Sequence, residues 1–227
     1  FDTDGTKNII SVNDVEKFED VTLEAIRKSF AKKTEQSLHE LLENVKKQGK
    51  FDFIPSERVF DYLVNVIFEH EFSGDSKKLS AWAAWEGEEA LGGDVVIPEG
   101  YDQVTDFMAK GLNIDLTTVV NTVTYSESGV LIETDQGVYS ADYAIITVPL
   151  GVLKSDLITF RPPLPETKKA AIECLEVGTL NKVWMIFPKV FWDQDKTVLG
   201  YVSEPKGHFC TRLYFNSLVA VSSTHST

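Results

Sequence analysis

Residues 138–153 read VYSADYAIITVPLGVL, and this stretch decides how the rest of the chain is interpreted. An acidic residue, Asp142, precedes the apolar run 143–148, which is short and rich in isoleucine and valine. Such a run is typical of a strand buried on both faces in the middle of a parallel sheet. Pro149 has no backbone N–H and Gly151 tolerates unusual dihedral angles, so the strand should leave the sheet abruptly. In open α/β sheets, that carboxyl end faces the ligand crevice.

Composition and charge limit the class of protein. The chain has 227 residues, of which 43% are hydrophobic, which is enough for the core of one large or two modest domains. Its formal net charge is -13, from 35 acidic and 22 basic residues. This balance argues against nucleic acid as a partner, because phosphate neutralisation needs basic surface. An acidic surface favours a cationic ligand, such as a polyamine or a lysine-rich tail, although many proteins carry one only for solvation.

The two cysteines, Cys174 and Cys210, have no metal-ligating neighbour at a useful spacing. We therefore expect no metal site and two buried, reduced thiols in an intracellular protein, with a disulfide as the alternative. No apolar segment approaches the length that crosses a bilayer, so no membrane partner is expected. The first residues, FDTDGTKN, are neither a signal peptide nor a natural initiator sequence, which favours an excised piece of a longer chain.

The first part of the chain is predicted to be helical. Asn13 and Glu16 resemble a capping pair, and apolar residues then recur at helical spacing until the stop signal at 46–49. This pattern predicts one long or two broken amphipathic helices. Pro55 and Ser56 open a further helix whose apolar side chains cover nearly its whole circumference, so this helix should be buried.

The middle of the chain changes character. A helix is expected at 101–110, with Val104, Phe107 and Met108 turned inward. Three strand-like runs separated by turns follow, at 116–125, 130–134 and 138–148. They predict a β-meander whose last strand enters a parallel sheet.

The last part of the chain is predicted to combine a helix with strands. The helix runs from Pro165 to residue 175. Strand-like runs follow at 183–187, 198–202 and 209–215. The final segment, VAVSSTHST, is small, polar and aperiodic, and we expect it to be disordered.

Three stretches carry a resemblance to a known family: SADYAIITVPLGVLKSDLITFRPPLP, then GTLNKV, then FPKVFW. They resemble the central part of the flavin-dependent amine oxidases. Within that family the polyamine oxidases are most similar, with spermine oxidases and histone lysine demethylases as relatives. The resemblance extends upstream through GYDQVTDFMAKGLNIDLTTVVNTVTY and covers residues 92–200. The first part of the chain matches loosely and the last stretch hardly at all.

The resemblance implies a fold of mixed α+β and α/β class, in which pieces of two domains interleave. Residues 1–92 correspond to the helical piece of a substrate-binding domain. Residues 93–156 correspond to a segment of an FAD-binding domain, with a helix, a β-meander and one strand of a Rossmann-like sheet. Residues 157–227 return to the substrate-binding domain with a helix, a sheet and a disordered tail. The first and third pieces should pack together.

The resemblance also implies FAD as the cofactor. In this family the lysine of the GxxNK stretch lies beneath the flavin and holds a water against its N5 atom, and Lys182 in GTLNK fits that pattern. A partly desolvated ammonium can orient a water and stabilise negative charge on reduced flavin, which makes Lys182 the predicted catalytic residue. The alternative is an ordinary solvated lysine. Val120 is implied to touch the adenine, and Val148, Pro149 and Leu150 to line the cofactor.

A small-molecule amine is the substrate that the resemblance implies. Glu71, at the end of the helix that Pro55 opens, is the candidate for binding the substrate ammonium, with an exposed carboxylate of no function as the alternative. Hydride would pass from the carbon beside the nitrogen to FAD, the iminium would be hydrolysed, and oxygen would reoxidise the flavin and form hydrogen peroxide. This chemistry needs neither a nucleophile nor a metal.

The flavin site is expected to be incomplete in these residues. The chain has no GxGxxG turn between a strand and a helix, so the pyrophosphate and ribose of FAD have no recognisable seat. We therefore expect an internal fragment that binds FAD weakly, turns over little, and needs the rest of its parent chain. An intracellular location, cytoplasmic or peroxisomal, is expected. A histone-demethylase-like amine oxidase and a non-catalytic acidic binding module stay open as alternatives.

Overall fold

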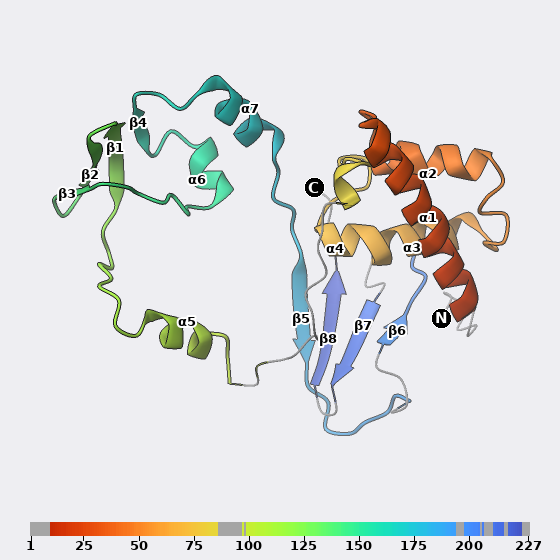
Figure 1. The fold of residues 1–227 in the computed structure, drawn as a ribbon. Helices are drawn as coiled ribbons and strands as arrows, with labels where there is room; N and C mark the ends of the chain where they lie inside the picture. The colour runs from red at the N-terminus through yellow and green to blue at the C-terminus, as the bar shows by residue number, and fades with distance from the viewer. Residues whose placement is uncertain are drawn as a thin grey trace. The chain divides into compact units, whose positions relative to one another are not determined.

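The structure is a computed structural model that describes residues 10–85, 97, 99–193, 198–204, 206, 211–215 and 218–223. The chain divides into two compact units (Figure 1). The first unit joins Phe1–Glu88 with Gly178–Thr227, and the second is Glu89–Val177. The predicted boundaries at residues 92 and 156 concern the domains of a whole flavoprotein, and they stay predictions.

Two amphipathic helices begin the first unit: α1 spans Val12–Lys32, and α2 spans Leu38–Lys47. The Ser11 hydroxyl accepts a hydrogen bond from a backbone N–H of the first turn and caps α1. The predicted cap at Asn13 is therefore wrong, because the helix has already begun there. Lys33 takes a left-handed conformation with a φ of 48° and ends α1, so the sequence forms two helices rather than one.

The third helical run carries a change of helix type. It consists of α3 (Glu57–Val64), the π-helical turn η1 (Asn65–Glu69) and the short α4 (His70–Phe72). Ser56 caps α3 through its side chain, at the predicted start of the helix. A π turn inserts an extra residue into the helix and re-aims the side chains that follow it, and such turns are frequent at functional sites.

The core of the first unit forms between these helices. Phe18 is fully buried, and its ring centroid lies 5.0 Å from that of Phe51, 5.8 Å from that of Phe60 and 6.5 Å from that of Phe68. The predicted burial of the helix opened by Pro55 is confirmed, because most of the apolar residues of α3 and η1 belong to this core. The 3-10 helix η2 (Ala83–Trp85) packs on α1.

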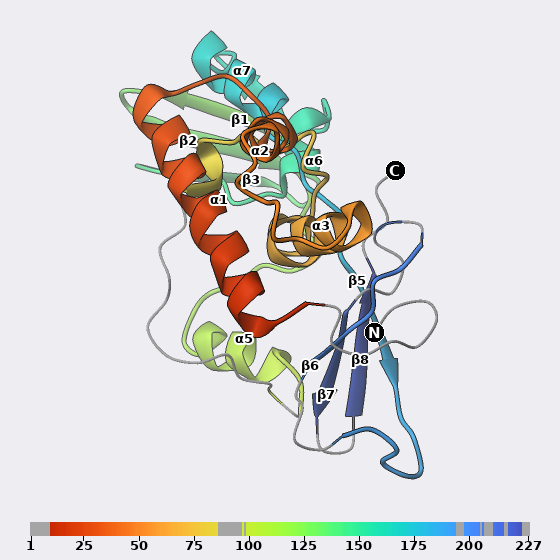
Figure 2. The same cartoon turned by 90° about the vertical axis from the view of Figure 1, so that its right-hand side faces the viewer.

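A four-stranded sheet completes the first unit (Figure 2). Its strand order is β5-β8-β7-β6, and every pairing is antiparallel. The strands are β5 (Asn181–Met185), β6 (Val198–Gly200), β7 (Thr211–Phe215) and β8 (Leu218–Ser223). The expectation that the final segment is disordered is wrong for residues 219–223, because all of them pair with β5 and residues 219–222 also pair with β7.

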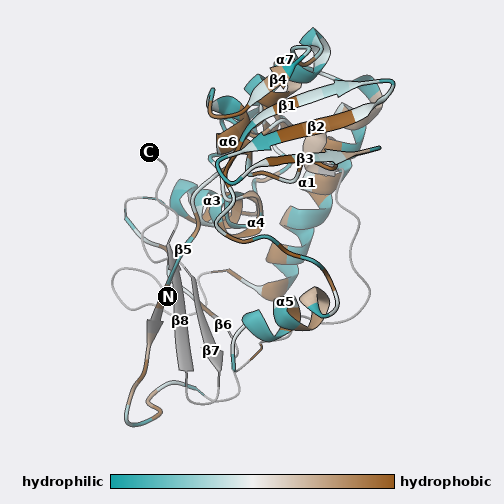
Figure 3. Cartoon of the chain, turned by 90° about the vertical axis from the view of Figure 1, so that its left-hand side faces the viewer, coloured by the Kyte–Doolittle hydropathy of each residue, from teal (hydrophilic) through white to brown (hydrophobic). Residues whose placement is uncertain are grey.

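The second unit is built on the predicted meander. Strands β1, β2 and β3 pair antiparallel in succession, and β4 pairs parallel with β1. Their bounds are Val120–Ser126, Gly129–Thr134, Val138–Ala141 and Thr159–Arg161. Its helices are α5 (Asp102–Ala109), α6 (Leu150–Lys154) and α7 (Glu166–Cys174). Figure 3 shows much of β2 in brown, the colour of apolar residues.

The run 143–148, predicted as a buried central strand, has no regular structure here. Strand β3 ends at Ala141, and the side chains of Tyr143 and Ile145 are 89% and 90% exposed. A strand buried on both faces needs neighbouring strands and covering layers. No described strand pairs with this stretch, and the parallel neighbour of β1 is β4 instead. The prediction is therefore wrong for the structure of these residues.

Two smaller predictions about burial in this unit are also wrong. Phe107 and Met108 on α5 are 71% and 69% exposed, because no described element packs extensively against α5. Cys174 at the end of α7 is exposed instead of buried, and Cys210 lies outside the described residues. The mixture of helices with four-stranded sheets agrees with the predicted fold class of interleaved α+β and α/β pieces.

Candidate functional site

A buried carboxylate, Glu69, closes the π turn of the first unit, and only 6% of the residue is exposed. Its Oε2 accepts a hydrogen bond of 2.9 Å from Asn65 Nδ2. Its Oε1 accepts one of 3.0 Å from the backbone N–H of Ser76 and another of 3.0 Å from Lys206 Nζ. A charge buried this deeply requires such partners, because it has lost most of its contact with water.

These partners keep Glu69 ionised. Burial acts to raise the pKa of the Glu69 carboxyl. The hydrogen bonds from Asn65 and Ser76 and the charge of Lys206 outweigh burial, and the pKa lies below its usual value. The site therefore presents a negative charge that already holds an ammonium group.

Two neighbours of Glu69 are shifted toward their neutral forms. Burial raises the pKa of Asp61 on α3, although the charge of Lys206 opposes this shift. Burial also lowers the pKa of His70, and the charge of Glu69 opposes that shift. The group of side chains thus combines one firmly ionised carboxylate with two groups whose charge burial disfavours.

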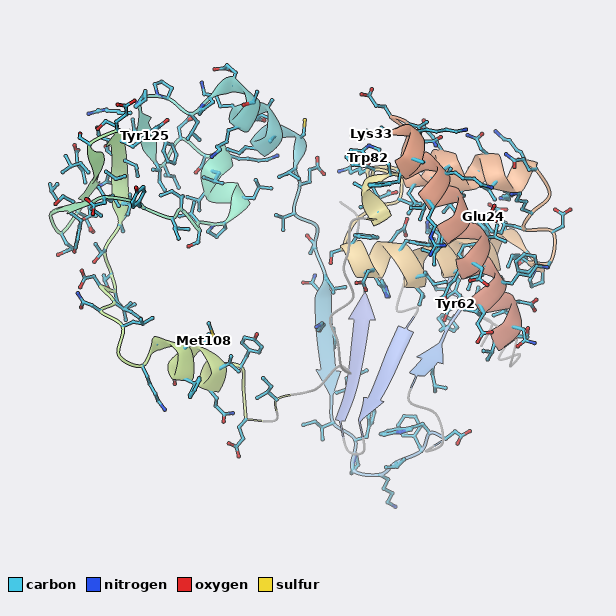
Figure 4. The ribbon with its side chains drawn as sticks, viewed as in Figure 1. Glu24, Lys33, Tyr62, Trp82, Met108 and Tyr125 are labelled. Atoms are coloured by element: carbon cyan, nitrogen blue, oxygen red, sulfur yellow. The ribbon has the colours of Figure 1, made fainter. Side chains whose placement is uncertain are left out.

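At two glycines, the sheet of the first unit and the segment before it lie very close to the helical run formed by α3, η1 and α4. A Cβ atom at Gly178 would lie 1.5 Å from the backbone oxygen of Ser73, the left-handed residue that ends α4. A Cβ atom at Gly200 in β6 would lie 1.9 Å from the Oη of Tyr62 on α3, which Figure 4 labels. The approach at Gly178 requires glycine because the atom it meets belongs to the backbone, whereas the Tyr62 side chain could move away from a Cβ atom at Gly200. Gly178 opens the GTLNK stretch, so the segment that leads into β5 and Lys182 passes against the helix end that follows Glu69.

The predicted flavin residues are distributed over both units. Lys182 lies in β5 of the first unit, where it is exposed and pairs with Ser222 of β8. Val120 begins β1 of the second unit and is half-buried. The remaining three residues stand at the start of α6, where Pro149 is the N-cap. Neither unit alone holds the whole predicted set, and the role of each residue stays a prediction.

The predicted cofactor residues of the second unit fit a flavin in character. Val120, Val148 and Leu150 are half-buried and Pro149 is exposed, so they leave apolar surface of the kind that an aromatic ring system covers. A Cβ atom at Gly151 would meet no heavy atom within 4 Å, so open space adjoins the first turn of α6.

A separate hollow of about 580 Å³ lies within the second unit. Its apolar lining includes Val123, Tyr143, Ile146 and Phe160, and Asp142 adds a carboxylate. It contains none of the predicted cofactor residues. We therefore do not assign it to the flavin.

Glu71, the predicted ammonium ligand, lies on α4 and is exposed. Its role stays a prediction, whereas the buried carboxylate two residues earlier, Glu69, was missed. The signal was present in the sequence. Asn65 and Glu69 are four residues apart and interrupt an apolar helix face at helical spacing, which is where a polar pair must have a specific use.

In the part of the chain that the structure describes, no group of three or more His, Cys, Asp or Glu side chains is arranged to hold a metal ion. No helix within those ranges combines the length and the apolar character that spanning a membrane requires.

A family profile and individual proteins of known name both match this chain. The sequence profile described as flavin containing amine oxidoreductase matches residues 10–223. Polyamine oxidase 2 of Arabidopsis thaliana is 43% identical over 135 residues, which are 59% of this chain and 27% of that protein. Lysine-specific histone demethylase 1 homolog 3 of Arabidopsis thaliana is 39% identical over 172 residues, which are 68% of this chain and 10% of that protein.

Solved structures show the same fold. A structure of putrescine oxidase bound to putrescine matches with a TM-score of 0.66 and 17% identity, over 96% of this chain and 53% of that one. A mutant of putrescine oxidase matches with a TM-score of 0.72 and 16% identity, over 94% of this chain and 52% of that one. The chain thus spans about half of these structures and about a quarter of the polyamine oxidase.

Proposed function

The chain belongs to the family of flavin-containing amine oxidoreductases, and we propose that it is part of an FAD-dependent oxidase of polyamines. Membership implies FAD as the cofactor. The proposed reaction oxidises a C–N bond of an amine of the spermine or spermidine type and releases hydrogen peroxide. The identity of 43% with a polyamine oxidase supports this substrate class, and so does the net charge of -13.

The observation that carries the proposal is the ionised carboxylate of Glu69. Its Oε1 lies 3.0 Å from the ammonium nitrogen of Lys206, so the site has the chemistry for binding an alkylammonium. A polyamine carries such groups at neutral pH. Glu71, exposed on the following turn, is proposed to attract the cation before it reaches Glu69.

The protein's part in the reaction is to hold the two reactants. FAD supplies the hydride acceptor when it is bound. Val120, Val148, Pro149 and Leu150 are proposed to line it through apolar contacts and backbone groups. Lys182 is proposed to orient a water beside it, since a lysine at the start of β5 can present its ammonium to solvent that a cofactor encloses.

We propose further that the 227-residue chain does not complete a flavin site by itself. The predicted cofactor residues divide between the two units, and the chain spans only part of its relatives. Mixing the chain with FAD, removing free cofactor by gel filtration and recording the absorbance tests this point. A protein without flavin absorbance is expected. Retained flavin together with peroxide release would contradict it.

The oxidase proposal itself is tested on a natural protein that contains this chain. We expect bound flavin and peroxide release with spermidine. Glu69→Gln should raise the KM for spermidine roughly tenfold or more, because a charge-assisted contact contributes about 1.5–3 kcal/mol. Glu71→Gln is the matched control two residues away and should have a smaller effect. A protein that holds no flavin would overturn the proposal in favour of a non-catalytic acidic binding module.

A second candidate function is oxidation of methylated lysine. The match of 39% to a histone demethylase homolog over 68% of this chain supports it. The same peroxide assay with a methylated lysine peptide separates the two. Turnover of the peptide without turnover of spermidine would favour the demethylase.

A further inference from the structure

The ammonium group on Glu69 comes from a distant part of the chain. Lys206 lies 137 positions after Glu69, beyond β6. The segment that leads to it is anchored, since Val202 is 3% exposed and belongs to the hydrophobic core, and Ser203 is 8% exposed. Tertiary packing, and not a neighbouring turn of helix, therefore sets the position of this lysine.

Lys206 is the more accessible partner of the pair. Its side chain is 33% exposed, whereas that of Glu69 is 8% exposed. The lysine can therefore leave toward water, where its charge is well solvated, while the carboxylate stays within the fold. The two backbone and amide donors, from Ser76 and Asn65, remain on Glu69 when the lysine leaves.

The surrounding charges favour a second cation. The positive charge of Lys206 acts on both Asp61 and Glu69, so a single lysine charge offsets the charges of two carboxylates. The other lysine near Asp61, Lys46, already forms ion pairs with Glu43 and Glu57. A dication would therefore meet more negative charge at this place than one lysine neutralises.

We propose that Lys206 is a specificity-determining residue that occupies the substrate's ammonium position on Glu69 and is displaced when a cationic amine binds. This inference rests on the proposed function, from which it takes the amine site at Glu69. It follows that an amine that pairs only weakly with Glu69 does not displace Lys206 and is excluded from the site. An amine with two ammonium groups replaces the lysine more easily than one with a single ammonium, because the charge of Lys206 acts on Asp61 as well as on Glu69.

Equilibrium binding to the 227-residue chain tests the inference without flavin turnover. Putrescine is titrated calorimetrically into the wild type, Lys206→Met and Lys206→Arg. Lys206→Met removes the competitor and keeps the length of the side chain, so its Kd should be about fivefold lower, as expected for an ion pair of ~1 kcal/mol. Lys206→Arg retains a cation and should bind as the wild type does. The neutral 1,4-butanediol should show no difference among the three.

The result that overturns the inference is a Kd of Lys206→Met equal to or higher than that of the wild type. A folding defect in that variant is bypassed by nuclear magnetic resonance of the wild type, with the Lys206 side chain assigned. Its ε-methylene and Nζ signals should shift toward those of a solvated lysine as putrescine is added. Signals that stay in place while putrescine binds would also overturn it.

The outcomes separate this inference from the proposed function. If putrescine binds but Lys206→Met does not bind it more tightly, the proposed role of Lys206 is overturned. The oxidase proposal is then unaffected. If Lys206→Met binds putrescine more tightly but the natural protein holds no flavin, the oxidase proposal is overturned. The displacement of Lys206 by an amine is then retained. Absence of putrescine binding in all variants overturns the inference and moves the amine site away from Glu69.

Discussion

The two units differ in how they use apolar residues. In the first unit, Phe18, Ile26, Leu42 and Leu63 are at most 1% exposed and belong to one core. In the second unit, Val123 is the one buried hydrophobic side chain among the described residues. Large apolar side chains such as that of Ile145, 90% exposed, lie on its surface instead.

This difference shows what a hydrophobic pattern can and cannot predict. The helices of the first unit bury their apolar faces against one another, so the pattern and the fold agree. The run 143–148 has the composition of a buried strand but no strand partner among the described residues. Contiguous apolar surface usually marks a place where another surface binds. The pattern thus indicates where burial is needed, and not what provides it.

The largest expected change in stability follows from altering the core of the first unit, and the matched substitution is on the exposed run of the second unit. Phe18→Ala removes a fully buried ring that contacts three other rings, and should lower the free energy of unfolding by about 3–5 kcal/mol. Ile145→Ala removes an exposed side chain and should change it by less than about 0.5 kcal/mol. Urea denaturation measures both. A large effect of Ile145→Ala would mean that the run is buried in solution.

The next largest change in stability is expected when a closely packed glycine, rather than an open one, is replaced by alanine. Gly178→Ala forces a Cβ atom against the backbone oxygen of Ser73 and should destabilise the first unit by about 1–3 kcal/mol, as overpacking does. Gly151→Ala in α6 meets no neighbour and should be neutral or stabilising by up to about 1 kcal/mol. Thermal unfolding followed by circular dichroism compares them. Equal midpoints for the two variants would contradict the close approach at Gly178.

The pH dependence of stability should locate the buried charges in the first unit. The pKa of His70 is lowered, so the unfolded chain takes up its proton first and stability falls as pH drops below about 6.5. The pKa of Glu69 is also lowered, so its stabilisation is present above about 4.3 and is lost as pH falls further. The pKa of Asp61 is raised, which opposes the loss from Glu69.

Urea midpoints between pH 7.5 and pH 3.5 measure the sum of these contributions. His70→Gln should flatten the upper part of the profile, and Glu69→Gln the lower part. A wild-type profile without any slope below pH 6.5 would contradict the burial of His70.

The smallest expected effect is in the second unit. Thr117 is exposed and takes a left-handed conformation with a φ of 55°, which a β-branched residue tolerates poorly. Thr117→Asn should stabilise the unit by about 0.5 kcal/mol, because asparagine tolerates this conformation better. Hydrogen exchange of the β1 and β2 amides measures the change. Thr117→Val is the control and should not stabilise.

Much of the local structure could be predicted from the sequence. The helix after Pro55, the meander and α7 were predicted, because capping residues, turn residues and apolar spacing act over a few positions. The family likewise follows from short stretches such as GTLNK. The family resemblance predicts a carboxylate at the end of the helix that Pro55 opens, but it does not distinguish the exposed Glu71 from the buried Glu69.

The features that follow from the amino-acid sequence are therefore mostly local: the helix after Pro55, the turns, the acidic charge and the family. Which carboxylate is buried depends on the folded chain, since the partner of Glu69 is a lysine 137 positions away. The tertiary structure also decided that Gly178 abuts Ser73 and that residues 219–223 pair as part of β8. The physical reason is the same in each case. Burial, charge pairing and strand pairing depend on neighbours that chain folding brings together, and no local pattern specifies those neighbours.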